Sequence, residues 1–389
     1  MAIYLDHAAT SPLRPAVLEA MLPYLTTHAG NPSSLHGSGR RARQGIDEAR
    51  EIIANAIGVQ PREIVFTSGG TEADNLAVKG VAWAATARGR HLVTSAVEHK
   101  AILNAVAILE RANFGITVLP VDRSGRVDPL DVAAALTERT TLVSVMAASN
   151  EVGTIQPIAE IGEIVRGHGA RFHVDAVQYA AHAPIDVDAW QADLVSLSAH
   201  KLGGPQGVGA LFVRRGTQLL PQLQGGSQER QRRAGTENVA GIVGFGAAFA
   251  LAHADVAAEA DRLRGLSARL REGLLSMEGV TLTGHEDHRL PNNVSVVIDG
   301  VEGGDLVAAL DLEGVEVSTG SACTSGSTEP SHVLLAMGID PYLAHGSLRI
   351  TTGPETTSAD VDAALAAIRT VMPRLRAVEG IHPKVVATA

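Results

Sequence analysis

The chain has 389 residues, more than one hydrophobic core readily accommodates, so we expect two domains. With 45% hydrophobic and 19% charged residues the composition is that of a soluble globular protein, and the net charge of −10 argues against a general affinity for nucleic acid or anionic membranes. The single cysteine, Cys323, excludes an intramolecular disulfide and argues against a thiolate zinc site.

The sequence contains no signal for export or membrane insertion. No stretch approaches the roughly 18 apolar residues of a membrane span. The N-terminal MAIYLDHAAT lacks the basic region and the apolar core of a signal peptide. We therefore expect a cytoplasmic protein that makes no membrane contact.

The first half of the chain alternates between helical and strand patterns. Helical spacing is found at 17–25, where Pro23 is expected to kink or shorten the helix, and at 45–57. Buried strands are predicted at 64–67, 92–94, 116–121, 142–146, 172–174 and 194–197, and a further helix begins at Ile158. This alternation predicts an α/β domain with a largely parallel sheet.

The turn after the first of these strands has the features of an anion site. Ser68, Gly69, Gly70 and Thr71 lead into a helix that begins at Glu72. Free N–H groups and the helix dipole at such a terminus favour phosphate. The turn matches neither the Walker loop nor the dinucleotide fingerprint, so the motif alone leaves a plain capped helix and a phosphate site as equal alternatives.

Four polar residues stand where predicted strands finish: His99, Asn150, Asp175 and Lys201. In open α/β sheets, ligands bind at the carboxyl ends of the strands, so we expect these four side chains to converge. Each has a structural alternative when taken singly, because His99 and Asp175 can cap helices and Asn150 can occupy a turn.

Lys201 has the most specific placement. It follows the apolar run 194–197 and precedes Gly203 and Gly204. Desolvation lowers the pKa of a lysine and makes its amine a better nucleophile, which favours a Schiff-base lysine that holds a carbonyl cofactor. The alternative is a surface lysine in a turn.

Beyond the sheet, a loop at 225–238 carries Arg230, Arg232 and Arg233, which we interpret as a contact for a small anionic ligand rather than for nucleic acid. From about Val239 the pattern predicts one long alanine-rich helix of nearly forty residues that links to a second, α+β domain. That domain has predicted strands at 280–282, 294–298 and 348–351, and helices at 305–312 and 360–371. Residues 285–288, His-Glu-Asp-His, resemble metal ligands in composition, but we interpret them as a surface turn before Pro291.

Together these residues supply what pyridoxal phosphate chemistry requires. Lys201 offers the amine for the aldehyde, and Asp175 the carboxylate that keeps the pyridine nitrogen protonated. His99 offers a flat group for the ring face, and Arg349 a bidentate partner for an amino-acid carboxylate. The donors expected at the phosphate are Gly70, Thr71, Ser198, His200 and Thr236.

These motifs resemble the cysteine desulfurases of the NifS/IscS type, within the fold-type I pyridoxal phosphate enzymes. The resemblance runs from YLDHAAT at 4–10 to beyond Arg349. It includes NPSSLH at 31–36, GGTE at 69–72, SNE at 149–151, DAVQ at 175–178, SAHK at 198–201, AGTEN at 234–238 and SACTSG at 321–326. The last motif is similar to the long cysteine loop of group I members.

The resemblance implies a fold and a set of residue roles. A large domain at 15–255 would hold a mixed, mostly parallel seven-stranded sheet flanked by helices. A small domain, at 1–14 and 256–389, would carry the cysteine loop and the substrate arginine. Gln178 would bond the ring hydroxyl, Asn31, Asn150 and Arg349 would hold the substrate, and Thr236 would reach the phosphate of a neighbouring subunit in a homodimer.

The implied activity is removal of sulfur from L-cysteine to give L-alanine and a persulfide on Cys323. The sulfur would pass to a protein acceptor such as an iron–sulfur scaffold or a tRNA or DNA thiolation protein. Three alternatives stay open: a selenocysteine lyase, an aminotransferase on the same fold, and a non-catalytic sulfur-relay scaffold.

Overall fold

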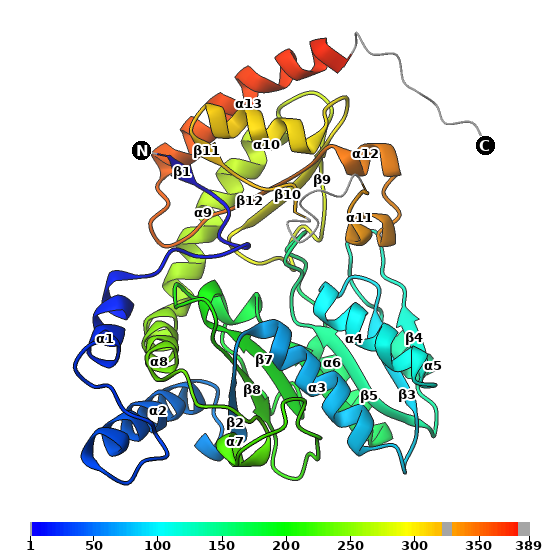
Figure 1. The fold of residues 1–389 in the computed structure, drawn as a ribbon. Helices are drawn as coiled ribbons and strands as arrows, with labels where there is room; N and C mark the ends of the chain where they lie inside the picture. Colours follow the sequence, from blue (N-terminus) through cyan, green and yellow to red (C-terminus); the bar gives the residue numbers. More distant parts are fainter. Residues whose placement is uncertain (1, 321–328, 380–389) are drawn as a thin grey trace.

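The computed structural model describes residues 2–320 and 329–379. Its larger part is built on a seven-stranded sheet (Figure 1). In spatial order the strands are β2 (Ile64–Thr67), β8 (Gly209–Val213), β7 (Leu194–Ser198), β6 (Arg171–Asp175), β5 (Thr140–Met146), β3 (His91–Ser95) and β4 (Gly115–Leu119). β8 is antiparallel to both of its neighbours, and the other pairs are parallel. The prediction of a mixed, mostly parallel sheet is confirmed.

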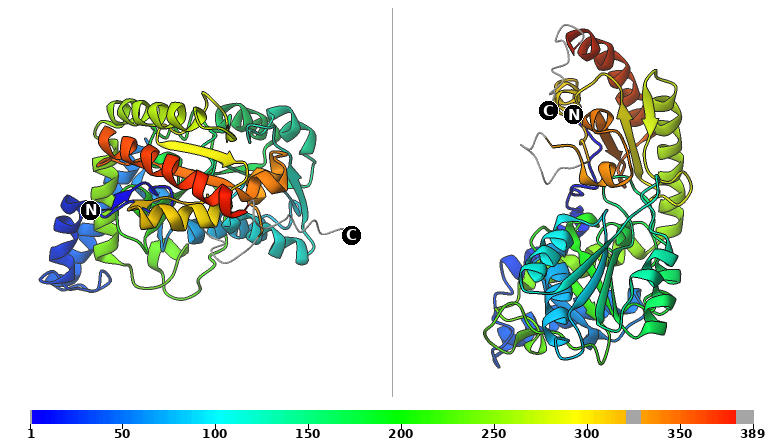
Figure 2. Two further views of the ribbon diagram at one scale, coloured as in Figure 1. Left: turned by 90° about the horizontal axis from the view of Figure 1, so that it is seen from above. Right: turned by 90° about the vertical axis from the view of Figure 1, so that its right-hand side faces the viewer.

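Helices cover both faces of this sheet, which is why its central strands are buried on both faces (Figure 2). All residues of β5, β7 and β8 are buried. The helices are α1 (Pro15–Leu25), α2 (Gly37–Ala56), α3 (Gly70–Ala84), α4 (Lys100–Arg111), α5 (Pro129–Ala135), α6 (Ile158–His168), α7 (Gln228–Gln231) and α8 (Val239–His253). Short 3-10 turns lie at η1 (Pro61–Glu63), η2 (Tyr179–Ala181) and η3 (Ala199–Lys201).

A second unit contains the rest of the described chain. Its sheet has the antiparallel order β12 (Ser347–Thr351), β10 (Asn293–Ile298), β9 (Val280–Leu282), and β1 (Ile3–Tyr4) pairs in parallel with β11 (Val315–Glu316). Its helices are α9 (Val256–Leu275), α10 (Gly303–Leu312), α11 (His332–Ala336), α12 (Pro341–His345) and α13 (Ser358–Glu379). Leu5 shares a core with side chains between Leu266 and Met372, apart from the core of the large sheet. These separate cores support the proposed domain division at residues 14 and 256.

The single long helix predicted from Val239 is wrong. α8 and α9 are separate helices whose axes differ by 72°. The side chain of Asp255 accepts a hydrogen bond from Ala258 N at 3.3 Å and so caps the N-terminus of α9. A new helix therefore begins at Val256 and α8 does not continue. In the described part of the chain no single helix is long and apolar enough to cross a membrane, and α8 with α9 meets that test together by length and composition only.

Candidate active site

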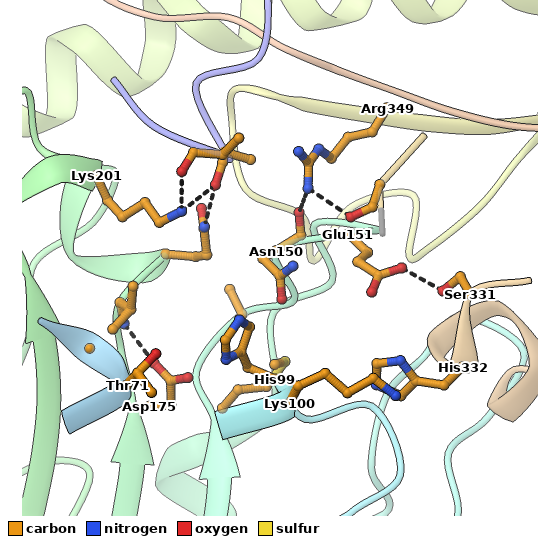
Figure 3. Close-up of a pocket in the computed structure, with 18 of the residues that line it drawn as sticks. Thr71, His99, Lys100, Asn150, Glu151, Asp175, Lys201, Ser331, His332 and Arg349 are labelled. Carbon is orange, nitrogen blue, oxygen red and sulfur yellow. Dashed lines mark hydrogen bonds between the residues drawn. The ribbon is translucent and has the colours of Figure 1, made fainter. Parts of the chain in front are cut away.

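A cavity of about 540 Å³ lies where the strands of the large sheet end and the second unit begins. We call it the central cavity. All four residues predicted at strand ends line it, and Figure 3 shows His99, Asn150, Asp175 and Lys201 around one space. The other predicted residues in its wall are Gly70, Thr71, Gln178, Ser198, His200 and Arg349. The expectation that these distant segments converge is therefore met in space.

Lys201 ends the 3-10 turn that follows β7, and its side chain reaches the N-terminal part of the chain. Its Nζ donates hydrogen bonds to the carbonyl oxygens of Ala8 and Ala9, both at 2.6 Å (Figure 3). Ala8 O also accepts from Gln178 Nε2 at 2.8 Å. The amine is thus held at the cavity wall by a pair of carbonyl groups.

Asp175 is the last residue of β6 and is only 7% exposed. Burial raises the pKa of its carboxyl, while the Val177 N–H at 2.9 Å and the nearby His99 and Lys201 act in the opposite direction. A buried carboxylate with Lys201 nearby is suited to pair with a protonated ring nitrogen, the role that the sequence predicts for it.

Behind Asp175 lies a second buried carboxyl that the sequence reasoning missed. Asp74, on α3, is 1% exposed and also lines the central cavity. Its pKa is raised well above the usual value by burial and by the charge of Asp175. Beside it, His173 bonds the hydroxyls of Ser144 and Ser196, each at 2.9 Å. The signal for Asp74 is an acidic residue among the apolar positions Ala73, Leu76 and Ala77 of one helix.

His99 caps the N-terminus of α4. Its Nδ1 accepts the Ala101 N–H at 3.1 Å, so the proton of the neutral ring is on Nε2. The ring is therefore locked in one tautomer at the cavity wall. His99 therefore caps α4 and also lines the central cavity.

The anion-binding end of the cavity is formed by the start of α3. Gly69 has φ 151° and gives the helix no side-chain cap, so the N–H groups of its first turn are available to a ligand. Ser198 Oγ is buried there and has no hydrogen-bond partner among the described residues. A second cavity of about 440 Å³ adjoins these groups and is lined by Ser68, Gly69, Gly70, Thr71, Ser198 and His200. These donors fit a phosphate group.

Two contacts define the shape of this end. A Cβ on Gly70 would meet Val177 Cγ2 at 2.7 Å, so the backbone comes close at this point. His200 Nδ1 lies 3.2 Å from Thr10 Oγ1. Burial, with a smaller effect of Lys201, lowers the pKa of His200 to about 4, so the ring is neutral at pH 7.

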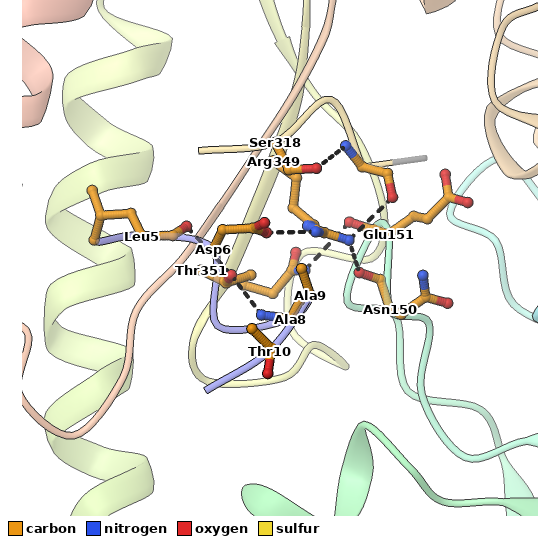
Figure 4. Close-up of polar contacts among 12 residues, drawn as sticks. Leu5, Asp6, Ala8, Ala9, Thr10, Asn150, Glu151, Ser318, Arg349 and Thr351 are labelled. Atoms are coloured by element: carbon orange, nitrogen blue, oxygen red, sulfur yellow. Dashed lines mark hydrogen bonds and ion pairs between the residues drawn. The ribbon is translucent and has the colours of Figure 1, made fainter. Parts of the chain in front are cut away.

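Arg349 lies at the opposite end, on β12, and is 1% exposed. Its Nη2 pairs with Asp6 Oδ1 at 2.7 Å, and its Nη1 donates to the carbonyls of Asn150 at 2.9 Å and Gly320 at 3.1 Å (Figure 4). Asn150 therefore contacts Arg349 through its backbone, while the residue as a whole lines the cavity.

The remaining wall was not predicted. It contains Lys100, Glu151, Ser331 and His332 (Figure 3). Ser331 Oγ donates to Glu151 Oε2 at 2.5 Å, and His332 Nε2 donates to the carbonyl of Glu98 at 3.0 Å. Ser331 and His332 lie at the N-terminus of α11, whose short pattern gives no signal before the fold is known.

Two of the predicted residues that the structure describes are not in this wall. Asn31 Oδ1 accepts from Ser33 N at 2.9 Å, and Thr236 is exposed on its loop; neither lines the central cavity. Cys323 lies outside the described residues. Within 2–320 and 329–379, which include residues 285–288, no three His, Cys, Asp or Glu side chains are grouped so that they could hold a metal ion.

Comparisons with known proteins agree on one family. The family model described as aminotransferase class V matches residues 3–364. A protein of Dictyoglomus turgidum named cysteine desulfurase IscS is 51% identical over 377 residues, which cover 97% of this chain and 96% of that protein. A solved structure titled NIFS-like protein superimposes with a TM-score of 0.91 at 36% identity, covering 96% of this chain and 100% of that one. A structure titled SspA in complex with cysteine gives a TM-score of 0.80 at 35% identity, covering 91% and 99%.

Proposed function

This chain belongs to the class V aminotransferase family, among its cysteine desulfurases, and we propose that it takes sulfur from L-cysteine and leaves it as a persulfide on Cys323. The observation that carries this assignment is the convergence of Lys201, Asp175 and the uncapped start of α3 on one cavity. An amine, a buried carboxylate and an anion site at this spacing suit one cofactor.

That cofactor is pyridoxal phosphate, and the residues present fit it. Lys201 would hold its aldehyde carbon, Asp175 its ring nitrogen and Gln178 its ring hydroxyl. Gly70, Thr71, Ser198 and His200 would hold the phosphate, and the orphaned Ser198 Oγ supports this placement. When bound, the cofactor draws electrons from the substrate Cα, which makes the Cα–H acidic.

The chain's own groups then have separate tasks. The Lys201 amine takes the Cα proton. The Nε2–H of His99, whose position follows from its bond to Ala101, is the group that can give a proton on the same side. Arg349 and Asn150 hold the α-carboxylate of L-cysteine.

The sulfur transfer is balanced within the protein and substrate. The Cys323 thiolate attacks the substrate sulfur and forms the S–S bond, while the substrate C–S bond breaks and its electron pair stays on carbon. That carbon takes up a proton, so L-cysteine and a thiol become L-alanine and a persulfide. No external oxidant or reductant is needed.

We also propose where the protein acts and with which partners. The chain would act in the cytoplasm as a homodimer in which Thr236 contacts the partner's phosphate site, and the exposure of Thr236 supports a role outside its own cavity. The persulfide would go to a protein acceptor, either an iron–sulfur scaffold or a tRNA or DNA thiolation protein.

The decisive experiment measures sulfide and L-alanine from L-cysteine with the pyridoxal phosphate-loaded protein. With dithiothreitol present to reduce the persulfide and release its outer sulfur as sulfide, equal amounts of both are expected, and Cys323→Ser should abolish both while the lysine-bound chromophore persists. Turnover retained in Cys323→Ser would point to an aminotransferase. A protein that binds no pyridoxal phosphate would point to a sulfur relay, and preference for L-selenocysteine to a selenocysteine lyase.

A further inference from the structure

Arg349 is the most buried cation at the cavity, and it depends on one acidic partner. Its side chain is 2% exposed, and its ion pair with Asp6 is its only one within the described ranges. A buried guanidinium without a counter-ion is strongly disfavoured, so we expect loss of the Asp6 charge to lower the stability of the fold, separately from any effect on substrate binding.

Asp6 itself is firmly placed. It lies in the segment of residues 5–10, which leaves the small sheet and crosses to the central cavity (Figure 4). Thr351 N donates to Leu5 O at 2.8 Å, and Ala8 N donates to Thr351 Oγ1 at 2.9 Å, so β12 holds this segment on both sides of Asp6. Asp6 and Arg349 are therefore both fixed by the same strand.

The contacts divide the guanidinium into two ends. Asp6 takes Nη2, and Nη1 donates to the carbonyls of Asn150 and Gly320, two residues that line the cavity (Figures 3 and 4). These bonds together fix the plane of the guanidinium, and the charge-assisted one to Asp6 keeps Nη1 on the cavity side, where a substrate carboxylate would replace a carbonyl as its acceptor.

We propose that Asp6 is a positioning residue for substrate recognition: by holding Nη2 it aims Nη1 of Arg349 at the α-carboxylate of L-cysteine. The inference rests on the proposed function, because it assigns Arg349 to that carboxylate. Asp6 does not touch the substrate; it acts through the arginine.

The charge of Asp6 and its hydrogen bond have opposite effects on substrate binding, so the two can be separated by experiment. Its negative charge competes with the incoming carboxylate for one cation, whereas its hydrogen bond orients that cation. Asp6→Asn keeps an Oδ1 acceptor and removes the charge. Asp6→Ala removes both. Positioning by the hydrogen bond requires the alanine variant to be impaired and the asparagine variant to be rescued.

The test is a binding titration of the pyridoxal phosphate-loaded protein in a Cys323→Ser background, where sulfur transfer is blocked. L-cysteine is compared with cysteamine, which has the same amine and thiol but no carboxylate, and binding is followed by the cofactor absorbance. We expect Asp6→Ala to weaken L-cysteine binding about tenfold or more, with cysteamine binding unchanged. Asp6→Asn should bind L-cysteine within about threefold of the parent.

Asp362→Ala is the matched control, since it removes the acidic partner of another arginine, Arg269, in an exposed ion pair that does not line the central cavity. It should show no selective loss for L-cysteine. Equal losses for L-cysteine and cysteamine in Asp6→Ala, or no loss for either, would overturn the inference. If the parent protein binds no L-cysteine, the proposed function fails instead.

Discussion

Gly70 is the residue at which backbone and cofactor site come closest. A side chain here would meet Val177 Cγ2 at 2.7 Å, two residues after the β6 carboxylate Asp175. Overpacking of this kind costs about 1–3 kcal/mol, because either Val177 or the start of α3 has to shift. Gly70 therefore links the position of the phosphate-binding start of α3 to that of the segment that follows Asp175.

We predict that Gly70→Ala raises the dissociation constant of pyridoxal phosphate about tenfold, since the shifted helix start misplaces its N–H donors. Fluorescence titration of the apoprotein measures this constant. Gly265→Ala is the control, because a Cβ at Gly265 meets nothing within 4 Å. It should leave cofactor affinity unchanged and stabilise α9 by about 0.5–1 kcal/mol. Equal affinities in Gly70→Ala and the parent protein would refute the steric argument.

At the level of single residues, the sequence predicts the functional side chains whose place in the chain already indicates their role. Lys201 and Asp175 follow strands, so their convergence could be expected before the fold was known. Asp74 and Glu98 could not be found in this way, because their importance comes from burial next to another carboxyl. His332 reaches the cavity only through a short helix far along the chain. Tertiary neighbours, not local patterns, create these three.

Among the elements, the turn α7 has a conformation that its surroundings must enforce. Glu229, Arg230 and Gln231 have φ of 45°, 56° and 64°, which is rare for residues other than glycine. The buried Glu229 carboxylate accepts two bonds from Arg50, at 2.6 and 2.8 Å, and one from Phe66 N at 2.9 Å. One acidic side chain thus joins α2, β2 and the arginine-rich loop.

We expect Glu229→Ala to destabilise the fold by about 3–5 kcal/mol, because Arg50 would keep a buried charge with no partner. Chemical denaturation gives the free energy of unfolding. Asp362→Ala breaks the exposed pair with Arg269 and should cost only about 0–1 kcal/mol. Similar losses in the two variants would show that burial does not govern the Glu229 pair.

Element prediction failed where the local pattern was ambiguous. β8, with the sequence GALFV, was not predicted, because its glycine-rich approach at 203–207 resembles a loop. Its antiparallel place between β2 and β7 comes from sheet pairing alone. The break between α8 and α9 was missed because alanine-rich residues on both sides hide the capping role of Asp255.

For the whole molecule, Glu98 ties stability to pH. Burial raises its pKa to about 8, with a further contribution from Asp175, against hydrogen bonds from Ser95 and Met146 N. Between its ordinary value of 4.5 and about 8, the folded state keeps a proton that the unfolded state releases. Stability therefore falls as pH rises through this window, by about 1.4 kcal/mol per pH unit for this one group.

Glu98→Gln should remove that slope, since glutamine keeps the acceptor oxygen and has no proton to lose. Urea unfolding of the cofactor-saturated proteins at pH 5, 6, 7 and 8 measures the free energy of unfolding. Relative to the parent protein, this free energy should increase in the variant toward pH 8. Burial lowers the pKa of His182 to about 4. This shift changes the stability of the fold only as the pH falls below 6.5, and it does so equally in the variant and in the parent protein. Parallel pH profiles would contradict the assignment.

The pairing of β1 with β11 also has a consequence for biosynthesis. Ile3 is synthesised more than 300 residues before its partner Val315. At translation rates of 5–20 residues per second, the first strand waits about 15–60 s for its neighbour. Asp6 lacks its partner Arg349 until β12 has also been made, whereas every strand of the large sheet is available once Val213 has been synthesised. The core of the large sheet can thus form first, and the arginine end of the cavity is completed later.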